Sequence, residues 1–254
     1  MVLDAFKLDG RVALVTGASR GLGAAMAAAL AEAGADVVLT ARTKDDLEDV
    51  AGGIRQLGRK ALAVPADVTV RADVERATAE ALAAFRRIDV LVNNAGVGSD
   101  TAFLDLADAD WDRVMAANVR SAYLCTQVVG RHMVERRRGK IINVASVAGL
   151  VGRPRMVPYA ASKGAMLQLT RSVAVEWARH NVQVNAICPG YFRTAMNAAF
   201  LDSKAGTEYV RTAIPMQRAG RAEELGPMVV FLASAASDYI TGASIVIDGG
   251  RLAH

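Results

Sequence analysis

Three polar side chains near the middle of the sequence have types and spacing that suit proton transfer. Tyr159 and Lys163 lie four residues apart, so they share one face if the segment is helical, and Ser146 lies thirteen residues upstream. A phenol titrates at about pH 10 in water, but a nearby ammonium in the low-dielectric floor of a cleft favours the phenolate. A serine hydroxyl can then hold a carbonyl oxygen beside the phenol. The set predicts acid–base chemistry at an oxygen whose carbon gains or loses hydride.

Tyr159 and Lys163 alone would also fit an ordinary surface helix. The functional interpretation therefore depends on the strands and helices that surround the pair. Short apolar runs alternate with helical patterns, and the runs are apolar on both faces, as in strands buried in a parallel sheet. Strands are expected at residues 12–15, 37–40, 61–64, 90–92, 141–144, 182–187 and 245–247. Helices are expected at about 22–34, 44–56, 71–85 and 159–179, with a helix or helix pair over 109–137. This order predicts an α/β fold: one Rossmann-type, doubly wound domain over residues 1–254, with about seven parallel strands and helices on both faces.

Composition narrows the classes of partner. The chain has 254 residues, 52% of them apolar, and a net charge of +4 with acids and bases interspersed, so no nucleic-acid partner is expected. No charge-free run reaches the length of a membrane span, and Asp4 interrupts what would have to be the apolar core of a signal peptide. Cys125 and Cys188 make no disulfide framework, which favours a reducing, cytoplasmic location. The three histidines are scattered, so no metal site is expected.

A glycine-rich turn follows the first expected strand. Gly17, Gly21 and Gly23 have the spacing G-x-x-x-G-x-G and precede an amphipathic helix. Glycines let the backbone approach a pyrophosphate, whose charge meets the amide dipoles at the helix N-terminus. The context predicts dinucleotide binding rather than a turn shaped only by geometry.

The end of the second expected strand indicates which dinucleotide is bound. An acid there selects NAD and a base accommodates NADP, and this chain has Ala41 and Arg42 with no acid. Arg42 could pair with a 2′-phosphate, helped by Arg20 and Lys44, or these could be ordinary surface bases. We expect NADP(H) to be preferred, with NAD(H) also accepted.

These motifs together resemble those of the short-chain dehydrogenase/reductase family. The matching positions are Thr16–Gly23, Asn93–Gly96, Asn118, Ser146, Tyr159 with Lys163, and Pro189–Gly190 with Thr194. They occur in the family's order and spacing, and the likeness runs from about Lys7 to Gly250. The resemblance implies an oxidoreductase that interconverts a ketone and a secondary alcohol by hydride transfer.

The resemblance also assigns roles to individual residues. Tyr159 would be the catalytic acid/base, and Ser146 would orient the carbonyl. Lys163 would lower the pKa of the tyrosine and bind the nicotinamide ribose, and Asn118 would hold a water in the proton relay. The implied cofactor site consists of Gly17, Ser19, Arg20, Gly21, Leu22, Gly23, Arg42, Asp67, Val68, Asn94, Ala95, Gly96, Tyr159, Lys163, Pro189, Gly190 and Thr194.

The sequence indicates the substrate less clearly than it indicates the cofactor. The expected substrate residues are Ser146, Met156, Tyr159, Tyr191 and Met196. The chain is similar to gluconate 5-dehydrogenases, whose substrate is a sugar acid, and nearly as similar to 3-oxoacyl-carrier-protein reductases. The second group tends to present two arginines near the site mouth, where this chain has Arg137 and, at the second position, His180 beside Arg179. Arg193 could meet a carboxylate or be solvated, and a broad carbonyl reductase remains a further alternative.

Three further expectations concern the whole molecule. The stretch at about Gly190–Arg221 looks irregular and too long for a plain connection, so we expect a substrate lid. The resemblance implies a homotetramer, with helices around Asn118–Arg137 and Tyr159–Arg179 between subunits and Trp177 and Leu167 as candidate contacts. The alternative from another class is a non-catalytic, dinucleotide-binding redox sensor, although such relatives typically lack the tyrosine.

Overall fold

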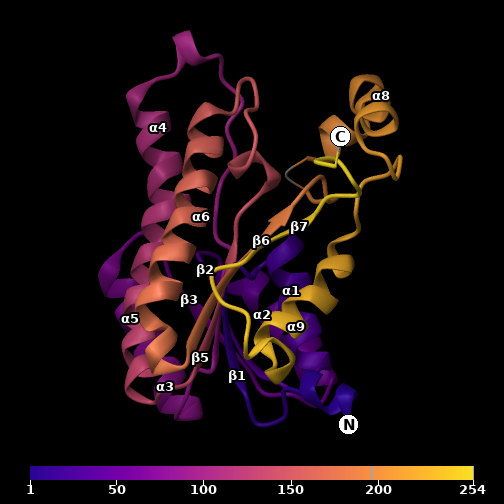
Figure 1. The fold of residues 1–254 in the computed structure, drawn as a ribbon. Coiled ribbons are helices and arrows are strands. Elements are labelled where there is room, and N and C mark those ends of the chain that lie inside the picture. The colour runs from indigo at the N-terminus through magenta and orange to yellow at the C-terminus, as the bar shows by residue number, and fades with distance from the viewer. Residues whose placement is uncertain (196, 254) are drawn as a thin grey trace.

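The fold is a parallel sheet covered by helices on both faces (Figure 1). The computed structural model describes residues 1–195 and 197–253, so the expected substrate residue Met196 lies outside the described residues. In spatial order the sheet runs β3-β2-β1-β4-β5-β6-β7. The strands are β1 (Val12–Thr16), β2 (Asp36–Ala41), β3 (Ala61–Pro65), β4 (Val90–Asn93), β5 (Gly139–Val144), β6 (Val182–Pro189) and β7 (Ser244–Ile247). The predicted doubly wound sheet of parallel strands is confirmed.

Burial on both faces explains why the strands are almost uniformly apolar. Every residue of β1, β4 and β6 is buried, so a polar alternation along these strands would place unsolvated groups against the helices. The pairing runs in register along the chain, with Val12–Thr16 opposite Asp36–Thr40.

Two sets of helices bury the two faces of the sheet (Figure 1). On one face α1 packs between α2 and α9, and on the other α3, α5 and α6 pack side by side. The longer helices are α1 (Gly21–Glu32), α2 (Lys44–Gln56), α3 (Arg71–Phe85), α4 (Asp108–Met115), α5 (Ser121–Glu135), α6 (Val157–Trp177), α8 (Lys204–Ala213) and α9 (Gly226–Ala233). In the ranges that the structure describes, no helix combines the length and apolar character that crossing a membrane requires.

The helix pair expected over 109–137 is joined by one π-helical turn. Residues Ala116–Arg120 form this turn between α4 and α5, and they carry Asn118 with its side chain fully buried. An inserted residue of this kind often marks a functional position, because it re-aims the side chains around it.

The stretch predicted as irregular contains two helices. α7 (Ala198–Leu201) and α8 lie within Gly190–Arg221, so the expectation of an irregular segment is wrong. The two ends of the stretch are held together, because Phe192 forms an isolated bridge with Gly220. The segment is therefore a helical flap closed at its base. The helical pattern was missed because α8 is flanked by short turns and presents only Gly206 to the interior.

Candidate active site

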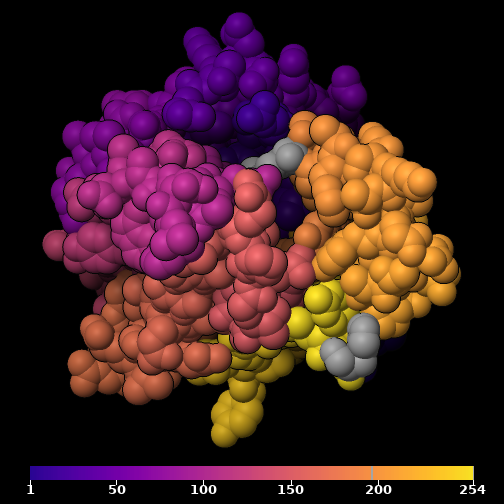
Figure 2. All heavy atoms as spheres, turned by 90° about the horizontal axis from the view of Figure 1, so that it is seen from above, coloured from indigo at the N-terminus to yellow at the C-terminus, as the bar shows by residue number. Residues whose placement is uncertain are grey.

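The strand order reverses between β1 and β4, and such a switch point opens a crevice at the carboxyl ends of the strands. Seen from that end, the molecule is hollowed between the helical flap, in orange, and the segments around residues 100–160, in magenta to salmon (Figure 2). The residues predicted as catalytic and cofactor-binding all come from elements that end or begin at this edge. The fold therefore gathers them around one cleft.

The glycine turn leaves no room for side chains. Gly17 has a φ of +63°, and a Cβ built on Gly23 would lie 2.2 Å from the Gly17 carbonyl oxygen. The Asn94 carboxamide Nδ2 donates to the carbonyl oxygens of Thr16 and Gly17, each at 3.0 Å. Asn94 thus holds the turn against the end of β4, and Gly21, also at positive φ, remains open toward Thr194. The arrangement offers backbone amides at the start of α1 to an anion.

The residues at the adenosine end are exposed cations and one constrained carboxylate. Arg20 and Arg42 are exposed, and among residues 1–195 and 197–253 neither side chain has a hydrogen-bond or ion-pair partner. Asp67 Oδ1 accepts from the backbone and hydroxyl of Thr69 at 2.9 and 2.7 Å. These two hydrogen bonds fix the orientation of the Asp67 carboxylate and leave its Oδ2 free to accept a hydrogen bond from a ligand. Val68 beside it is buried.

Ser146 follows β5 and caps the short helix η4 (Val147–Gly149). Its backbone is extended, and its Oγ accepts from the Ala148 amide at 3.1 Å. The residue is 8% exposed. Because one lone pair is used by the cap, the hydroxyl proton and the other lone pair are left for groups in the cleft.

Tyr159 lies in the first turn of α6 and is hydrogen-bonded to Ser146. Burial of the phenol raises its pKa, and the hydrogen bond with Ser146 only partly opposes that effect. Desolvation is the larger effect, because the protein around the phenol disfavours its anionic form. The role that the resemblance gives Lys163, lowering the pKa of the tyrosine, stays a prediction.

Lys163 lies one turn further along α6, 4% exposed, with Nζ 5.6 Å from the centre of the Tyr159 ring. Nζ donates to the carbonyl oxygen of Val144 at 2.7 Å. Burial lowers the pKa of this lysine to about 8. The ammonium is therefore easily discharged until an additional acceptor, such as a ribose hydroxyl, stabilises it.

Asn118 links the π-helical turn to the other side of the cleft. Its Oδ1 accepts from the Val97 amide at 2.8 Å, and its Nδ2 donates to the Val97 carbonyl at 3.0 Å and to Ser162 Oγ at 2.9 Å. Gly96 is required beside it, since a Cβ there would lie 2.9 Å from Asn118 Oδ1. Both amide protons are engaged, so a relay water would have to donate to this residue rather than accept from its side chain.

A buried polar chain fixes the strands and helices that carry these groups. Asn93 Nδ2 donates to Thr126 Oγ1 at 2.9 Å and to Asn143 Oδ1 at 2.8 Å. Asn143 Nδ2 then donates to Thr170 Oγ1 at 2.8 Å. The chain joins β4 and β5 to α5 and α6, so the helix that bears Tyr159 is held in a fixed register against the strand that precedes Ser146. Such networks are costly to leave half satisfied.

The far side of the cleft contains a cluster that sequence reasoning missed. Arg153 donates to Tyr209 Oη at 2.8 Å and to Tyr191 Oη, and Arg251 donates to Tyr209 Oη at 3.2 Å. The rings of Tyr191, Tyr209 and Phe200 lie 5.0–6.2 Å apart. Of the expected substrate residues, Tyr191 belongs to this cluster, and Met156 is the N-cap residue of α6.

Only Arg153 gave a signal in the sequence, since it stands between Ser146 and Tyr159 in the segment that leaves the carboxyl edge of the sheet. Tyr209 and Arg251 are distant in sequence and match no motif. They reach Arg153 only through the folding of the flap over residues 190–221 and of the C-terminal segment.

The structure shows where two further arginines considered for the substrate side lie. Arg193, a candidate for a substrate carboxylate, is paired with Asp202 at 2.5 Å. Arg137 lies between α5 and β5, at the amino edge of the sheet, whereas Ser146 follows β5 at the carboxyl edge. Within one chain, therefore, Arg137 is not near the site mouth. Its guanidinium donates instead to the Arg179 carbonyl at 2.9 Å.

A model of the short chain dehydrogenase family matches residues 11–205. The chain belongs to the short-chain dehydrogenase family. It is 40% identical over 249 residues to 5-keto-D-gluconate 5-reductase of Escherichia coli strain K12, covering 98% of each chain. It is 36% identical over 244 residues to a 3-oxoacyl-[acyl-carrier-protein] reductase of Thermotoga maritima, covering 96% of this chain and 98% of the relative.

The fold is also that of solved members of the family. A crystal structure of a gluconate 5-dehydrogenase from Burkholderia cenocepacia J2315, in complex with NADP and tartrate, is 40% identical with a TM-score of 0.96, covering 100% of both chains. The expected resemblance is confirmed, and this short-chain dehydrogenase is an oxidoreductase that acts on CH–OH groups. The sensor alternative is therefore set aside.

We predict that the affinity of this dehydrogenase for NADPH falls as the pH rises through about 8, because Lys163 discharges there in the free protein. A cofactor that accepts from the ammonium raises the pKa of Lys163, so binding takes up a proton above that pH, and Kd increases by about tenfold per pH unit at most. Fluorescence titration of NADPH across this range measures the slope. Lys163→Met should bind more weakly at neutral pH and show a flatter profile, and parallel profiles for the two proteins would contradict the assignment.

Proposed function

We propose that this enzyme is an NADP(H)-dependent oxidoreductase that interconverts a ketone and a secondary alcohol on a sugar acid. The observation that carries the proposal is Arg153, a part-buried guanidinium at the substrate side of the cleft whose partners in the described residues are two neutral phenols. A desolvated cation without a carboxylate partner is suited to bind one supplied by the substrate.

Catalysis is assigned to Ser146, Tyr159, Lys163 and Asn118. When bound, the nicotinamide supplies or accepts the hydride. In reduction, Ser146 Oγ donates to the carbonyl oxygen, and Tyr159 Oη transfers its proton to that oxygen as negative charge develops there. The raised pKa of Tyr159 keeps the phenol protonated for this step. Lys163 holds the ribose and stabilises the resulting phenolate, and Asn118 positions a water through which the proton is replaced.

The position of Arg153 supports a carboxylate-bearing substrate. The two phenol oxygens hold the guanidinium in one orientation, and its Cζ lies 5.3 and 5.5 Å from the centres of the Tyr191 and Tyr209 rings. A planar, pre-oriented guanidinium suits bidentate carboxylate binding. The names of the similar proteins agree, since one reduces a keto-gluconate and another was solved with tartrate, a dicarboxylate. A 3-oxoacyl thioester has no carboxylate for Arg153, and Arg137 lies at the other edge of the sheet.

NADP(H) is proposed as the preferred cofactor because β2 ends in Ala41 and is followed by the exposed Arg42. No carboxylate stands there to repel a 2′-phosphate. The similar gluconate 5-dehydrogenase contains NADP. The remaining contacts would come from the glycine turn, Ser19 and Leu22 within it, Asp67 with Val68, Asn94–Gly96, and the segment Pro189–Thr194.

The flap over residues 190–221 is proposed as the substrate lid. It carries Tyr191 and Tyr209 to Arg153, so a carboxylate bound at Arg153 would also fix the flap. Hydrogen exchange in α8 should slow when cofactor and substrate are both bound, and equal protection with and without them would count against the lid.

A homotetramer is proposed from the family resemblance, with α5 and α6 between subunits. Leu167 is buried within the chain, whereas Trp177, which packs against Gly130, is only partly buried and stays a candidate contact. The exposed apolar residues on these helices are Tyr123 and Val175. Light scattering that gives the mass of one chain at micromolar concentration would contradict the assembly. Two free, buried cysteines accord with the cytoplasmic location we propose.

The cofactor assignment predicts that NADPH is favoured over NADH by about tenfold or more in kcat/KM, since a charged hydrogen bond contributes roughly 1.5–3 kcal/mol. Arg42→Ala should weaken NADPH and leave NADH nearly unchanged, measured by steady-state kinetics at low salt. Arg55→Ala, which removes an exposed arginine from the far end of α2, is the control and should change neither. A wild-type enzyme that prefers NADH would show that Arg42 does not select the phosphate.

The substrate assignment predicts that Arg153→Leu lowers kcat/KM for 5-keto-gluconate by about ten- to a hundred-fold, because one charged hydrogen-bond pair is lost. The methyl ester of the same substrate lacks the carboxylate charge and should be reduced equally well by both proteins. Arg211→Ala, on α8 outside the cluster, is the control variant and should behave as wild type. If acid and ester lose activity equally in Arg153→Leu, the arginine only supports the flap.

A further inference from the structure

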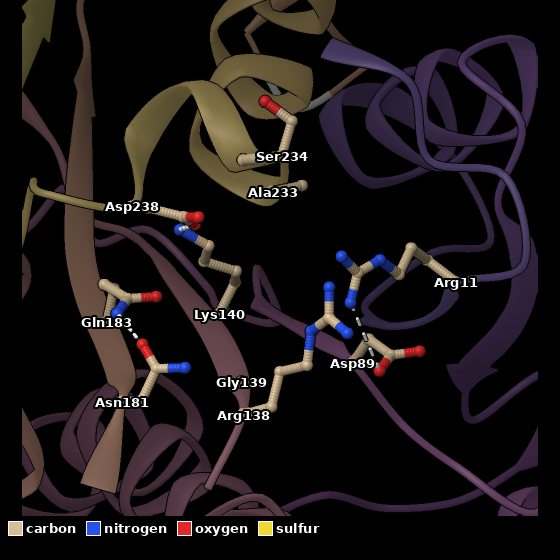
Figure 3. A pocket seen from close by; sticks show the side chains of 11 residues that line it. Arg11, Asp89, Arg138, Gly139, Lys140, Asn181, Gln183, Ala233, Ser234 and Asp238 are labelled. Carbon is tan, nitrogen blue, oxygen red and sulfur yellow. Dashed lines mark hydrogen bonds and ion pairs between the residues drawn. The ribbon is translucent and has the colours of Figure 1, made fainter. Parts of the chain in front are cut away.

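A second polar cavity lies at the opposite edge of the sheet from the cleft (Figure 3). It has a volume of about 220 Å³ and is lined where β1, β5 and β6 begin and where α9 ends. Lys140 at its wall and Ser146 beyond the far end of β5 are separated by the length of that strand. The catalytic chemistry assigned above uses none of the lining residues.

Positive charge is in excess here. Five cations in and around the cavity face two carboxylates. The cations are Arg11, Arg87, Arg136, Arg138 and Lys140, and the acids are Asp89 and Asp238. Lys140 pairs with Asp238 at 2.7 Å, which leaves the four guanidiniums around the single carboxylate of Asp89.

The acceptor capacity of Asp89 is already used. Its oxygens accept from the Val12 amide at 3.0 Å, from Nε and Nη2 of Arg87 at 2.6 Å each, and from Arg136 at 3.5 Å. A carboxylate offers about four lone-pair sites. Arg11 consequently approaches Asp89 only to 3.9 Å, beyond hydrogen-bond distance.

Arg11 and Arg138 are left facing each other. In Figure 3 their guanidinium groups point toward one another across the cavity, and the charge of Arg138, after burial, is the main cause that lowers the pKa of Arg11. In residues 1–195 and 197–253 neither side chain has a hydrogen-bond partner. Arg11 is part-buried and Arg138 is exposed, and two like charges held together at a concave site are relieved by an anion between them.

We propose that this cavity binds a phosphate group, free or esterified, between Arg11 and Arg138. Two guanidinium forks provide the bidentate donors that phosphate oxygens accept, while Lys140 at the wall is already paired with Asp238. The site is independent of the function proposed above and too far from Ser146 for one ligand to reach both. Binding there joins the start of β1 to the start of β5 and stabilises the fold.

Calorimetric titration with inorganic phosphate tests the site, with NADP⁺ at saturation so that the cofactor cleft is filled and chloride at matched ionic strength as the reference. Wild type should bind one phosphate per chain, and phosphate should raise the melting temperature more than chloride does. The variant with Arg11→Gln and Arg138→Gln should lose at least tenfold in affinity with unchanged turnover, whereas Arg55→Gln should bind as wild type. If the double variant does not fold, the same titration is done on Arg11→Gln and Arg138→Gln separately.

Two results would overturn the site: no saturable binding in wild type, or equal weakening in Arg55→Gln. Glycerol 3-phosphate provides the second arm. Tighter binding of this ester than of inorganic phosphate assigns the ligand as a phosphate ester, and weaker binding assigns it as the free ion; either supports the site. Phosphate that chloride displaces at equal ionic strength would mean a non-specific surface charge and would also overturn it.

Discussion

The burial of the Lys163 ammonium one helical turn from Tyr159 is the interaction on which the geometry of the candidate site depends. Its one hydrogen bond within the described residues, 2.7 Å to the Val144 carbonyl, fastens α6 to the end of β5. This contact places Tyr159 beside Ser146, which follows the same strand. Desolvation lowers the pKa of the lysine to about 8, still above neutral pH, and raises the pKa of the tyrosine. At neutral pH the protein alone therefore holds mainly an ammonium beside a neutral phenol.

The architecture around this contact is arranged to keep it rigid. The chain of side-chain hydrogen bonds through Asn93, Asn143 and Thr170 ties the two central strands to the two helices that carry the site. Asn118, re-aimed by the π-helical turn, reaches Ser162 one residue before Lys163. By contrast, the substrate side consists of a flap joined to the cleft through Arg153 and two phenols.

The fold could be predicted from the sequence for physical reasons, and the catalytic roles stay predictions. A strand that is buried on both faces must be apolar, and a backbone that approaches a pyrophosphate must use glycine. The strand Val12–Thr16 and the turn Gly17–Gly23 can therefore be predicted from the sequence alone. The cluster around Arg153 could not be predicted from the sequence. Arg153, Tyr209 and Arg251 meet only because the flap folds back over the cleft, and no local pattern encodes a contact between residues so far apart. The direction of the pKa shift of Tyr159 could not be predicted either, because it depends on desolvation of the phenol, which residue spacing does not reveal.

The most direct test of the account is single-turnover oxidation of NADPH by Tyr159→Phe with saturating 5-keto-gluconate. This substitution removes the transferable proton and preserves the packing of the ring, so the account predicts a hydride-transfer rate lower by about a hundred- to ten-thousand-fold. The dissociation constant of NADPH should stay close to that of wild type, because the cofactor contacts of Lys163 and the glycine turn remain. A variant that reduces the substrate at nearly the wild-type rate would show that the proton comes from another group and that the role assigned to the Ser146–Tyr159–Lys163 set is wrong.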